Sequence, residues 1–475
     1  MGGADHLARG RRRHRRRRRA RLARASGRHR VPRAGGGAAR AGAALDADRV
    51  AGGAAAGDGD GRGARRRAAA GAGDRGPRWP PGADLSPRRR LGVSALRVGG
   101  ARVRVGIDGR ELRDGVRTGI RRYLFEVLRA AANRGLECVV YGDRDTRLPA
   151  GTAATLSTLD GGWTQWWDQV TLPRALRRDG IDVFLSPYYK RPLAARCPTV
   201  ITIHDLFFIG YPGHSRPVYD AAMTSLARLY ARGAAAIVAD SEHSRRAIVA
   251  RLGLATDRIT VIPVGLGREF GPATPTAAQR ARYGLGARYV LYVGNFLPHK
   301  NLPRVLRAWA ALPAPLRSGC RLVLAGGDRA GRAPLASLVT TLGLDASVGF
   351  AGLVADQDLP ALYGGAVALV LPSLEEGFGL PALEAMACGA PVIASRRGAL
   401  PEVVDDAGLL VDPEDERALA AALVRVLGSG DERAVLARRG LARAARFTAE
   451  RTAGRVVDLL ETTAGLRPAL TGRAG

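Results

Sequence analysis

Two glutamates and the glycines between them have the types and spacing best suited to chemistry in this 475-residue chain. Glu376 and Glu384 are separated by seven residues that include two glycines. Carboxylates accept hydrogen bonds from hydroxyl groups, and a glycine-bearing loop that opens into a helix leaves backbone N–H groups free to bind an anion. A sugar nucleotide, with a pyrophosphate between two polyols, offers both kinds of group. The ordinary alternative is a helix whose N-terminus is stabilised by its own acids.

The elements around the two glutamates place them at one edge of a sheet. Residues 367–371 are consecutive apolar residues, which predicts a strand buried on both faces, and residues 391–394 predict the next strand. Pro381 suits the first turn of a helix because its missing N–H needs no partner there, and Gly389 suits the position after the helix ends. The loop and the helix therefore follow the carboxyl end of a strand, where α/β proteins bind ligands.

The complete run from Glu376 to Glu384 resembles the signature of glycosyltransferase family 4, whose members are retaining enzymes of the GT-B fold. The resemblance implies an α/β protein with two doubly wound Rossmann-like domains that face a cleft. It also implies that Glu376 is a catalytic residue that holds the donor sugar near its anomeric carbon, and that Glu384 holds the ribose hydroxyls. The backbone that would line the phosphates and the sugar is that of Gly377, Phe378, Gly379 and Leu380.

A second run, which contains Gly294, Asn295 and Lys300, resembles the family segment in which a lysine meets the pyrophosphate. Many members carry arginine at the position of Asn295, so we expect Lys300 to be the main cation. The helix dipole favours acidic residues at the start of a helix, so a lysine there itself indicates an anionic partner. In the segment 348–354, the resemblance implies that the backbone of Leu353 and Val354 contacts the nucleobase.

In the first half of the chain, candidate residues again follow strands. Gly119 precedes an amphipathic helix expected over residues 120–133, and the resemblance places it against the donor phosphate; alone, it would predict an ordinary turn. His204 follows the strand 200–203, and the resemblance implies a catalytic-site role in orienting the donor sugar by hydrogen bonding. We expect Asp205 to fix the tautomer of the His204 ring. A histidine at a strand end is otherwise a satisfied structural residue.

Two further features of this half concern positioning. Ser241 is a predicted N-cap of the helix that follows the strand 235–239. Trp163, Trp166 and Trp167 form a cluster that holds three of the five tryptophans. Such clusters fill cores or stack on sugars and interfaces, and here packing in the core or against a helix is at least as expected as contact with an acceptor.

The first 100 residues differ from the rest in composition. They contain 26 Arg and 7 Asp but no Lys or Glu, which gives +19 of the net charge of +31, and Trp79 is their only aromatic residue. So little apolar surface cannot offset the entropy of ordering, which predicts a disordered tail. The arginine runs favour either binding to nucleic acid or an anionic membrane, or a solvated extension that is not necessarily part of the natural product. The second interpretation is preferred, because no nucleic-acid-binding motif accompanies the charge.

The alternation of strands and helices predicts the organisation of the remaining residues. We expect an N-terminal Rossmann-like acceptor domain at 101–270, a linker near 266–286 and a C-terminal Rossmann-like donor-binding domain at 287–445. A helix at 446–465 is expected to cross back to the first domain.

The sequence also bears on localisation. No apolar core follows the arginine run, as it would in a secretion signal, and no apolar stretch approaches the roughly 18 residues of a membrane helix. The four cysteines are scattered without metal-site spacing, which indicates a reducing compartment, so we expect a cytoplasmic protein. Basic residues of the first domain favour either peripheral contact with the inner face of the plasma membrane or, as the preferred interpretation, solvated helix faces. They are Arg121, Arg122, Arg174, Arg177 and Arg178.

These features predict a retaining hexosyltransferase that needs no cofactor and no metal ion, because the sequence has no paired-aspartate motif for a divalent ion. The expected donor is a GDP- or UDP-linked sugar, with mannose as the first choice. The expected acceptor is a hydroxyl of a sugar or lipid-linked chain in polysaccharide or glycoconjugate synthesis. The alternatives are a sugar-nucleotide epimerase of the same fold and a basic nucleic-acid-binding protein that uses residues 1–100. A phosphate-loop ATPase is excluded, because GxxxxGK[ST] does not occur.

Overall fold

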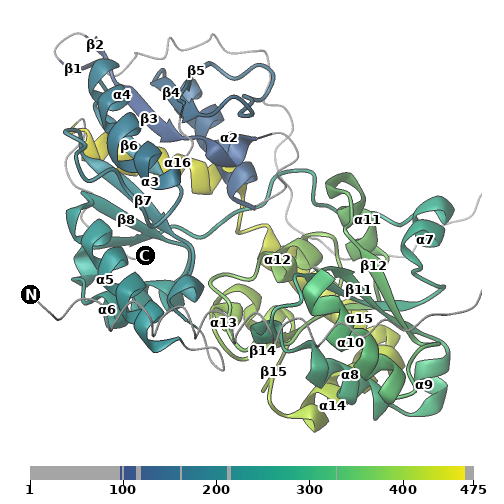
Figure 1. Cartoon of the computed structure of the whole chain (residues 1–475). Coiled ribbons are helices and arrows are strands. Elements are labelled where there is room, and N and C mark those ends of the chain that lie inside the picture. Colours follow the sequence, from purple (N-terminus) through teal and green to yellow (C-terminus); the bar gives the residue numbers. More distant parts are fainter. Residues whose placement is uncertain are drawn as a thin grey trace, which may run out of the picture. The chain divides into compact units, whose positions relative to one another are not determined.

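The computed structural model describes residues 97–98, 101–113, 119–160, 163–210, 216–327 and 329–465. The tail predicted to be disordered, residues 1–100, lies outside these residues except for β1 (Arg97–Val98), which pairs with β2 (Ala101–Arg102). The chain then forms two parallel sheets, each with helices on both faces (Figure 1). The predicted fold class, two doubly wound α/β domains, is confirmed.

The N-terminal sheet has seven parallel strands in the order β5-β4-β3-β6-β7-β8-β9. The chain adds strands to one side of β3 first and then to the other side, so the order reverses between β3 and β6. Ligands of doubly wound sheets bind outside the carboxyl ends of the strands at such a reversal. The strands are β3 (Arg104–Asp108), β4 (Glu137–Gly142), β5 (Ala154–Thr158), β6 (Val183–Ser186), β7 (Thr199–Ile203), β8 (Ala236–Ala239) and β9 (Ile259–Val261).

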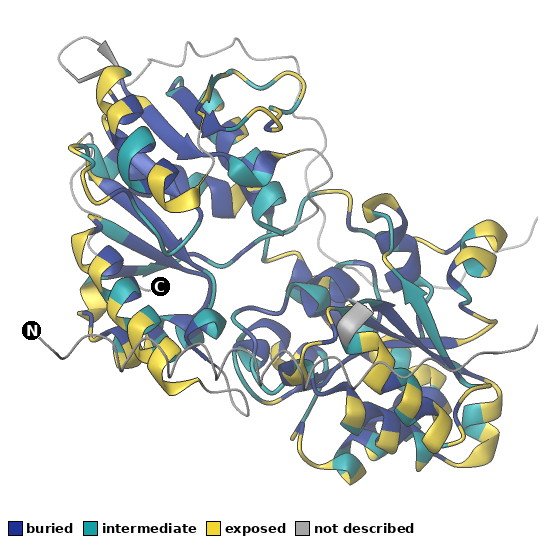
Figure 2. Cartoon of the chain, viewed as in Figure 1, coloured by how far each residue is buried: buried dark blue, intermediate teal, exposed yellow. Residues whose placement is uncertain are grey.

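Alternate residues of these strands face different helices, because successive side chains of a strand point to opposite faces. Val200 and Val238 pack in one core with α2 and α16, whereas Ile201 and Ile237 pack in another with α5 and α6. The strands are buried and the outer faces of the helices are exposed (Figure 2). The helices are α2 (Gly119–Asn133), α3 (Thr164–Trp166), the π-helix Trp167–Thr171, α4 (Leu172–Arg178), α5 (Pro217–Gly233), α6 (Glu242–Leu252) and α16 (Ala449–Thr463).

The C-terminal sheet has six parallel strands in the order β12-β11-β10-β13-β14-β15, so its reversal lies between β10 and β13. Elements that follow β10 and β13 therefore meet at the carboxyl edge beside the reversal. The strands are β10 (Tyr289–Gly294), β11 (Arg321–Gly326), β12 (Val348–Gly352), β13 (Ala368–Leu371), β14 (Val392–Ser395) and β15 (Leu409–Val411).

The helices of the C-terminal half cover both faces of this sheet. None of the helices in the described part of the chain is long and apolar enough to cross a membrane. They are α7 (Ala277–Tyr283), α8 (Leu302–Ala310), α9 (Ala314–Ser318), α10 (Arg329–Thr341), α11 (Leu359–Gly364), α12 (Leu380–Ala387), α13 (Leu400–Val404), α14 (Glu416–Gly428) and α15 (Gly430–Ala444).

The segment expected to be a linker, residues 266–286, contains the helix α7. Thr276 accepts a hydrogen bond from the backbone of Gln279, whose side chain accepts one from the backbone of Thr276 in return. This capping box satisfies two backbone donors that a short helix would otherwise leave unpaired. The Pro and Gly residues nearby predict a loop, whereas the capping box of Thr276 and Gln279 within this segment starts a helix.

The chain passes between the two sheets where residues 264–266 run beside residues 447–449. The Leu266 N–H donates to the Phe447 carbonyl at 3.0 Å, and the Ala449 N–H donates to the Leu266 carbonyl at 2.9 Å. A Cβ atom on Gly265 would lie 2.1 Å from the carbonyl carbon of Thr448, so only glycine fits here. Beyond this crossing, α16 packs against α2 through the buried residues Val456, Val457 and Leu460.

The crossing predicts a stability effect at Gly265. We expect Gly265→Ala to lower the free energy of unfolding by about 1–3 kcal/mol, because the added methyl group meets backbone atoms that cannot rotate away. Gly271→Ala is the matched control, since a Cβ atom there meets nothing within 4 Å. Thermal unfolding of both variants tests the prediction, and equal midpoints would contradict it.

Candidate active site

Lys300 and Glu376 meet at the reversal of the C-terminal sheet. Lys300 follows β10 and Glu376 follows β13, and the Lys300 Nζ donates to the Glu376 Oε1 at 2.7 Å. The same oxygen accepts a hydrogen bond from the Ser373 hydroxyl at 2.7 Å. Glu376 is buried, so its charge is stabilised by a paired cation and a hydroxyl rather than by water. The anionic partner that the sequence indicated for Lys300 is, in this structure, a carboxylate of the chain itself.

The loop after Glu376 leaves several backbone donors free. The N–H groups of Gly377, Phe378, Gly379 and Leu380 donate to no other described residue, and they stand just before the start of α12. Gly379 adopts φ 99°, a conformation that side chains disfavour, and a Cβ atom there would lie 2.5 Å from Leu400 Cδ2. Because the helix dipole and free N–H groups both favour negative charge, this loop can hold an anion next to Lys300.

Glu384 is buried in the first turns of α12 and is fully engaged. Its Oε1 accepts from the Arg122 Nη1 of α2 at 3.0 Å, and its Oε2 accepts from the Tyr363 hydroxyl of α11 at 2.7 Å. Arg122 belongs to the N-terminal half, so this ion pair joins the two sheets' domains. Each of these oxygens has one donor in the structure and can accept a second hydrogen bond, so a ribose hydroxyl could bond to Glu384 beside these partners or in place of one of them.

His204 follows β7 on the opposite side of the same cleft. Its Nδ1 lies 2.7 Å from the Oδ2 of Asp240, which follows β8, and its ring meets Tyr123 edge-on with centroids 6.1 Å apart. Burial opposes the charged ring, but the Asp240 carboxylate, with smaller contributions from Asp205 and the Pro187 carbonyl, raises the pKa of His204. The geometry therefore gives Nδ1 the proton that Asp240 accepts, while Nε2 is buried and has no hydrogen-bond partner among the described residues.

The expected role of Asp205 in fixing the His204 tautomer was wrong. The Asp205 Oδ1 accepts from the Phe207 N–H at 3.0 Å and so closes the turn after β7. Ile203 pairs with Ala239 in the sheet, which sets the next residues of the two strands, His204 and Asp240, side by side. Strand pairing, and not adjacency in sequence, selects the partner.

One cleft of about 740 Å³ gathers most of the predicted site residues. His299 also lines it, and burial together with Lys300 lowers the pKa of its ring to about 4, so it stays neutral near pH 7. The predicted residues in its wall are Gly119, His204, Asn295, Lys300, Glu376, Gly377, Phe378, Gly379 and Leu380.

Four predicted residues do not line this cleft. Glu384 lies behind it with Arg122, and Gly294 ends β10 with its carbonyl accepting from the Gly327 N–H at 2.9 Å. Leu353 and Val354 follow β12, and the Leu353 side chain is 82% exposed. Their expected contact with a nucleobase stays a prediction.

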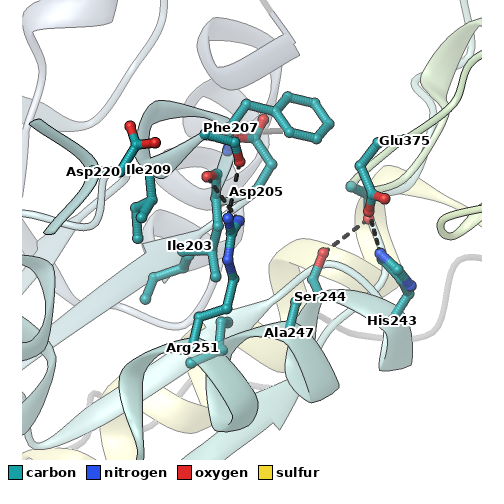
Figure 3. Close-up of a pocket in the computed structure, with 14 residues that line it drawn as sticks. Ile203, Asp205, Phe207, Ile209, Asp220, His243, Ser244, Ala247, Arg251 and Glu375 are labelled. Carbon is teal, nitrogen blue, oxygen red and sulfur yellow. Dashed lines mark hydrogen bonds and ion pairs between the residues drawn. The ribbon is translucent and has the colours of Figure 1, made fainter. Parts of the chain in front are cut away.

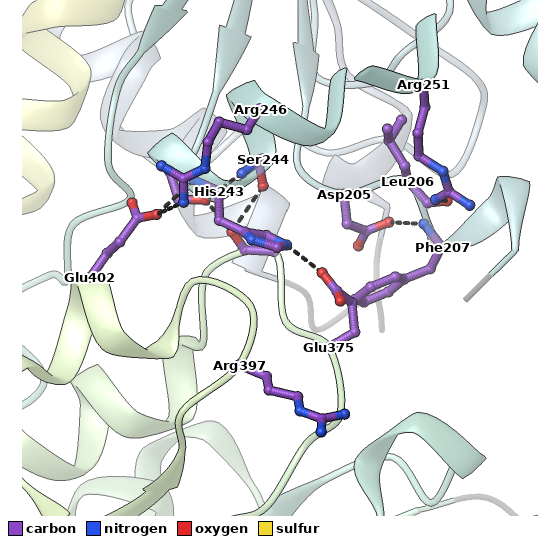
Figure 4. A network of polar contacts seen from close by, with 12 residues as sticks. Asp205, Leu206, Phe207, His243, Ser244, Arg246, Arg251, Glu375, Arg397 and Glu402 are labelled. Atoms are coloured by element: carbon purple, nitrogen blue, oxygen red, sulfur yellow. Dashed lines mark hydrogen bonds and ion pairs between the residues drawn. The ribbon is translucent and has the colours of Figure 1, made fainter. Parts of the chain in front are cut away.

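A network of polar contacts beside the cleft holds the loop 372–379 against the N-terminal sheet. The Gly377 carbonyl accepts from the Ser241 hydroxyl at 2.8 Å and the Ser244 hydroxyl at 3.0 Å. The Glu402 carboxylate accepts from the N–H groups of Glu242 and His243 at 2.8 and 2.7 Å, at the start of α6 (Figure 4). Ser241 is the N-cap of α6, as predicted, and accepts from the Ser244 N–H.

A second cavity of about 430 Å³ adjoins the cleft and shares Asp205, Phe207 and Gly377 with it. In Figure 3, His243 reaches Glu375 across this cavity, and Arg251 donates to the carbonyls of Leu206 and Gly210. The Arg251 contacts thus fix the loop after β7, and the His243–Glu375 contact joins α6 to the loop after β13.

Sequence reasoning missed the residues that pair with the predicted ones. Except for Ser373, which is three positions from Glu376, they lie far from their partners in the chain, and only the acid or hydroxyl types at strand ends and helix starts gave any signal. They are Arg122, Asp240, Ser244, Tyr363, Ser373 and Glu402.

Comparison with known proteins identifies the family. Residues 276–443 match the model of glycosyl transferases group 1, and residues 117–269 match the model of glycosyltransferase family 4. The chain is 34% identical over 254 residues to O-antigen chain mannosyltransferase B of Escherichia coli, which spans 53% of this chain and 67% of that protein. This chain belongs to glycosyltransferase family 4.

Two further proteins are similar to this glycosyltransferase over different shares of their own length. It is 30% identical over 273 residues to the serotype-specific mannosyltransferase WbdA of Escherichia coli, covering 55% of this chain but only 33% of WbdA. The crystal structure of HepE from Anabaena in complex with UDP-glucose matches with a TM-score of 0.61 at 21% identity, over 76% of this chain and 99% of HepE. The structural match shows the shared fold.

The contact at Gly377 predicts loss of activity when it is enlarged. A Cβ atom on Gly377 would lie 2.3 Å from the His204 carbonyl, so Gly377→Ala must displace the loop that carries Glu376. We expect the rate of glycosyl transfer to fall at least about tenfold, with a loss of about 1–3 kcal/mol in the free energy of unfolding. Gly428→Ala is the control, because a Cβ atom at this position of α14 meets nothing within 4 Å. It should retain the wild-type transfer rate and the wild-type free energy of unfolding. A variant as active as wild type would show that the loop need not touch β7.

The His204–Asp240 pair predicts a pH-dependent contribution to stability. The folded pKa of His204 is raised, so the pair stabilises fully below the unfolded pKa of about 6.5 and loses this effect as the pH rises through the folded pKa. Asp240→Asn removes the charge and keeps an acceptor, so it should cost about 1–3 kcal/mol at pH 6 and less at pH 9. Urea unfolding at both pH values measures the difference, and a cost that does not change with pH would refute the charged pair.

Proposed function

We propose that this glycosyltransferase moves a hexose, in the first instance mannose, from a nucleoside-diphosphate sugar to a hydroxyl of a saccharide or lipid-linked acceptor. We further propose that the transfer retains the anomeric configuration and needs no metal ion. The observation that carries the proposal is the Lys300–Glu376 pair at the reversal of the C-terminal sheet, next to four free N–H groups. A cation, an acid and an anion-binding loop stand together in one cleft.

The relatives support the choice of donor and acceptor. The Escherichia coli relative is named for transfer of mannose to O-antigen chains, and the HepE structure contains UDP-glucose. Those names describe those proteins; the proposal transfers the chemical classes, a nucleotide sugar and a saccharide hydroxyl, to this chain.

On this proposal, the diphosphate replaces Glu376 as the partner of Lys300. Its oxygens accept from the Lys300 ammonium and from the N–H groups of residues 377–380, which stabilise the negative charge that develops on the leaving group. Glu376, released from Lys300, accepts from hydroxyls of the sugar. His204, held through Nδ1 by Asp240, contributes to the wall of the cleft across from the sugar.

Ribose binding follows the same logic of exchange. The two ribose hydroxyls would take the Glu384 oxygen that now accepts from Arg122, while Tyr363 keeps the other oxygen in place. The released Arg122 stays close to Phe270, whose ring centre lies 5.2 Å from its guanidinium carbon. Donor binding would thus open one ion pair between the two domains.

The proposal predicts large kinetic effects at Lys300 and Glu376. Lys300→Ala and Glu376→Gln should each lower kcat/KM for transfer by about 10²–10³-fold, the effect of removing one stabilising group from a developing charge. Arg307→Ala, an exposed residue of α8 that pairs with Glu416, should leave kcat/KM unchanged. Thermal unfolding confirms that each variant is folded, and folded variants with wild-type turnover would overturn the assigned roles.

The assay itself separates the remaining alternatives. GDP-, UDP- and ADP-sugars are offered with a saccharide acceptor, and product analysis distinguishes transfer from epimerisation of the nucleotide sugar. The anomeric configuration of the product, read by NMR, tests retention, and addition of EDTA tests metal independence. Inversion of configuration, or loss of activity with EDTA, would refute the corresponding part of the proposal.

A further inference from the structure

Two exposed tryptophans stand at the carboxyl edge of the N-terminal sheet, outside the cleft. The Trp163 and Trp166 side chains are 66% and 53% exposed, whereas Trp167 is buried, so only one member of the cluster serves the core. Tyr219 is the sole other exposed aromatic side chain among the described residues. Because α3 follows β5 directly, its first turn lies at the same edge as the loops after β3, β6 and β7 (Figure 1).

The residues that follow these tryptophans in the chain are fixed by several contacts. The Arg110 guanidinium lies 4.0 Å from the centre of the Trp167 ring and pairs with Asp168 at 2.8 Å and with Asp108 at 2.5 Å. Gln169 of the same π-helix bonds to the Arg191 carbonyl at 3.1 Å. π-Helices are often found at functional sites, and a fixed base lowers the entropic cost of binding by the exposed rings above it.

Aromatic contacts connect this edge to the cleft. The Arg110 guanidinium lies 5.8 Å from the Tyr188 ring, and the next residue, Tyr189, stacks on Phe208 with centroids 4.0 Å apart. Phe208 lines the cleft together with His204. We call the exposed or partly exposed residues Phe208, Tyr189, Tyr188, Trp166 and Trp163 the aromatic band; Arg110 and the buried Trp167 connect its tyrosines to the segment that carries its tryptophans.

We propose that the aromatic band binds the extended saccharide part of the acceptor, so that this enzyme elongates a glycan of several rings rather than a single sugar. This inference rests on the proposed function, because the band ends where the acceptor hydroxyl would have to enter. Indole and phenol rings offer flat apolar faces for the C–H faces of sugar rings. Between Trp163 and Trp166 lie Thr164 and Gln165, both exposed, whose hydroxyl and amide groups suit sugar hydroxyls.

The chemistry of the segment favours a glycan over a lipid surface. An anionic membrane attracts clustered Lys and Arg beside interfacial aromatics, but residues 163–166 carry no charge. Arg110, which contacts the neighbouring Trp167, is already paired with two aspartates. Continuity with the cleft points to the acceptor.

The test is binding of the full chain to an array of bacterial and synthetic mannans, glucans and galactans from one to six rings. We expect wild type to bind chains of several rings, and the double variant Trp163→Ala/Trp166→Ala to bind them about tenfold more weakly or not at all. Trp163→Phe/Trp166→Phe keeps two flat rings and should restore most of the binding. Leu229→Ala, an exposed apolar residue of α5 in the same domain, is the control and should change nothing.

Transfer assays complete the test. The double alanine variant should lose efficiency with the long acceptor through KM, while hydrolysis of the nucleotide sugar without acceptor stays at the wild-type rate. The inference fails if wild type binds no glycan on the array, or if the double alanine variant binds glycans like wild type. Flotation with anionic phosphatidylglycerol vesicles is measured for both proteins. The inference also fails if this flotation is the only property that the double alanine variant loses. If wild type neither hydrolyses nor transfers any nucleotide sugar, the proposed function fails, and glycan binding on the array still decides the role of the band.

Discussion

The active-site arrangement depends on one contact, the Gly377 carbonyl that accepts hydrogen bonds from the Ser241 and Ser244 hydroxyls. It presses the loop after β13 against the end of β7 so tightly that no side chain fits at position 377. Because Glu376 and His204 belong to these two segments, the contact sets both in the wall of one cleft. Glu402 strengthens the arrangement from the same side, since its carboxylate accepts from the first N–H groups of α6, where the helix dipole favours negative charge.

The acids of the candidate site are paired with other side chains of the protein itself. Glu376 pairs with Lys300, Glu384 with Arg122, and Asp240 with His204. A buried carboxylate without a partner would cost several kcal/mol in desolvation, so each acid needs a cation or hydroxyls before any ligand arrives. A diphosphate and sugar hydroxyls supply the same kinds of group, so on the proposed function the donor would replace the contact that Lys300 and Glu376 now make with each other.

The fold and the loop that opens into α12 were predictable because their signals are local. Buried apolar runs marked β13 and β14, and Pro381 and Gly389 marked the helix between them, which the structure places at Leu380–Ala387. The partners of the acids were not predictable, since Arg122 and Glu384 are 262 positions apart and only tertiary packing joins them. The same reason explains why the sequence favoured Asp205 over Asp240 as the partner of the His204 ring. Adjacency along the chain can be read from a sequence, whereas the pairing of strands cannot. The tryptophan cluster divided between core and surface because the π-helix turns Trp167 and Asp168 inward while Trp166 stays outside.

The three ion pairs differ in what they require of the two domains. Lys300–Glu376 forms within the C-terminal half and His204–Asp240 within the N-terminal half, so both can exist whatever the separation of the halves. Arg122–Glu384 alone among them joins the halves, and it occupies the acid assigned to the ribose. On the proposed function, a donor whose ribose displaces Arg122 from Glu384 would remove a bond between the domains, while its diphosphate and sugar would lie between Lys300 and His204. The nucleotide end and the sugar end of such a ligand would then act on the domain contact in opposite directions, the first releasing it and the second bridging it.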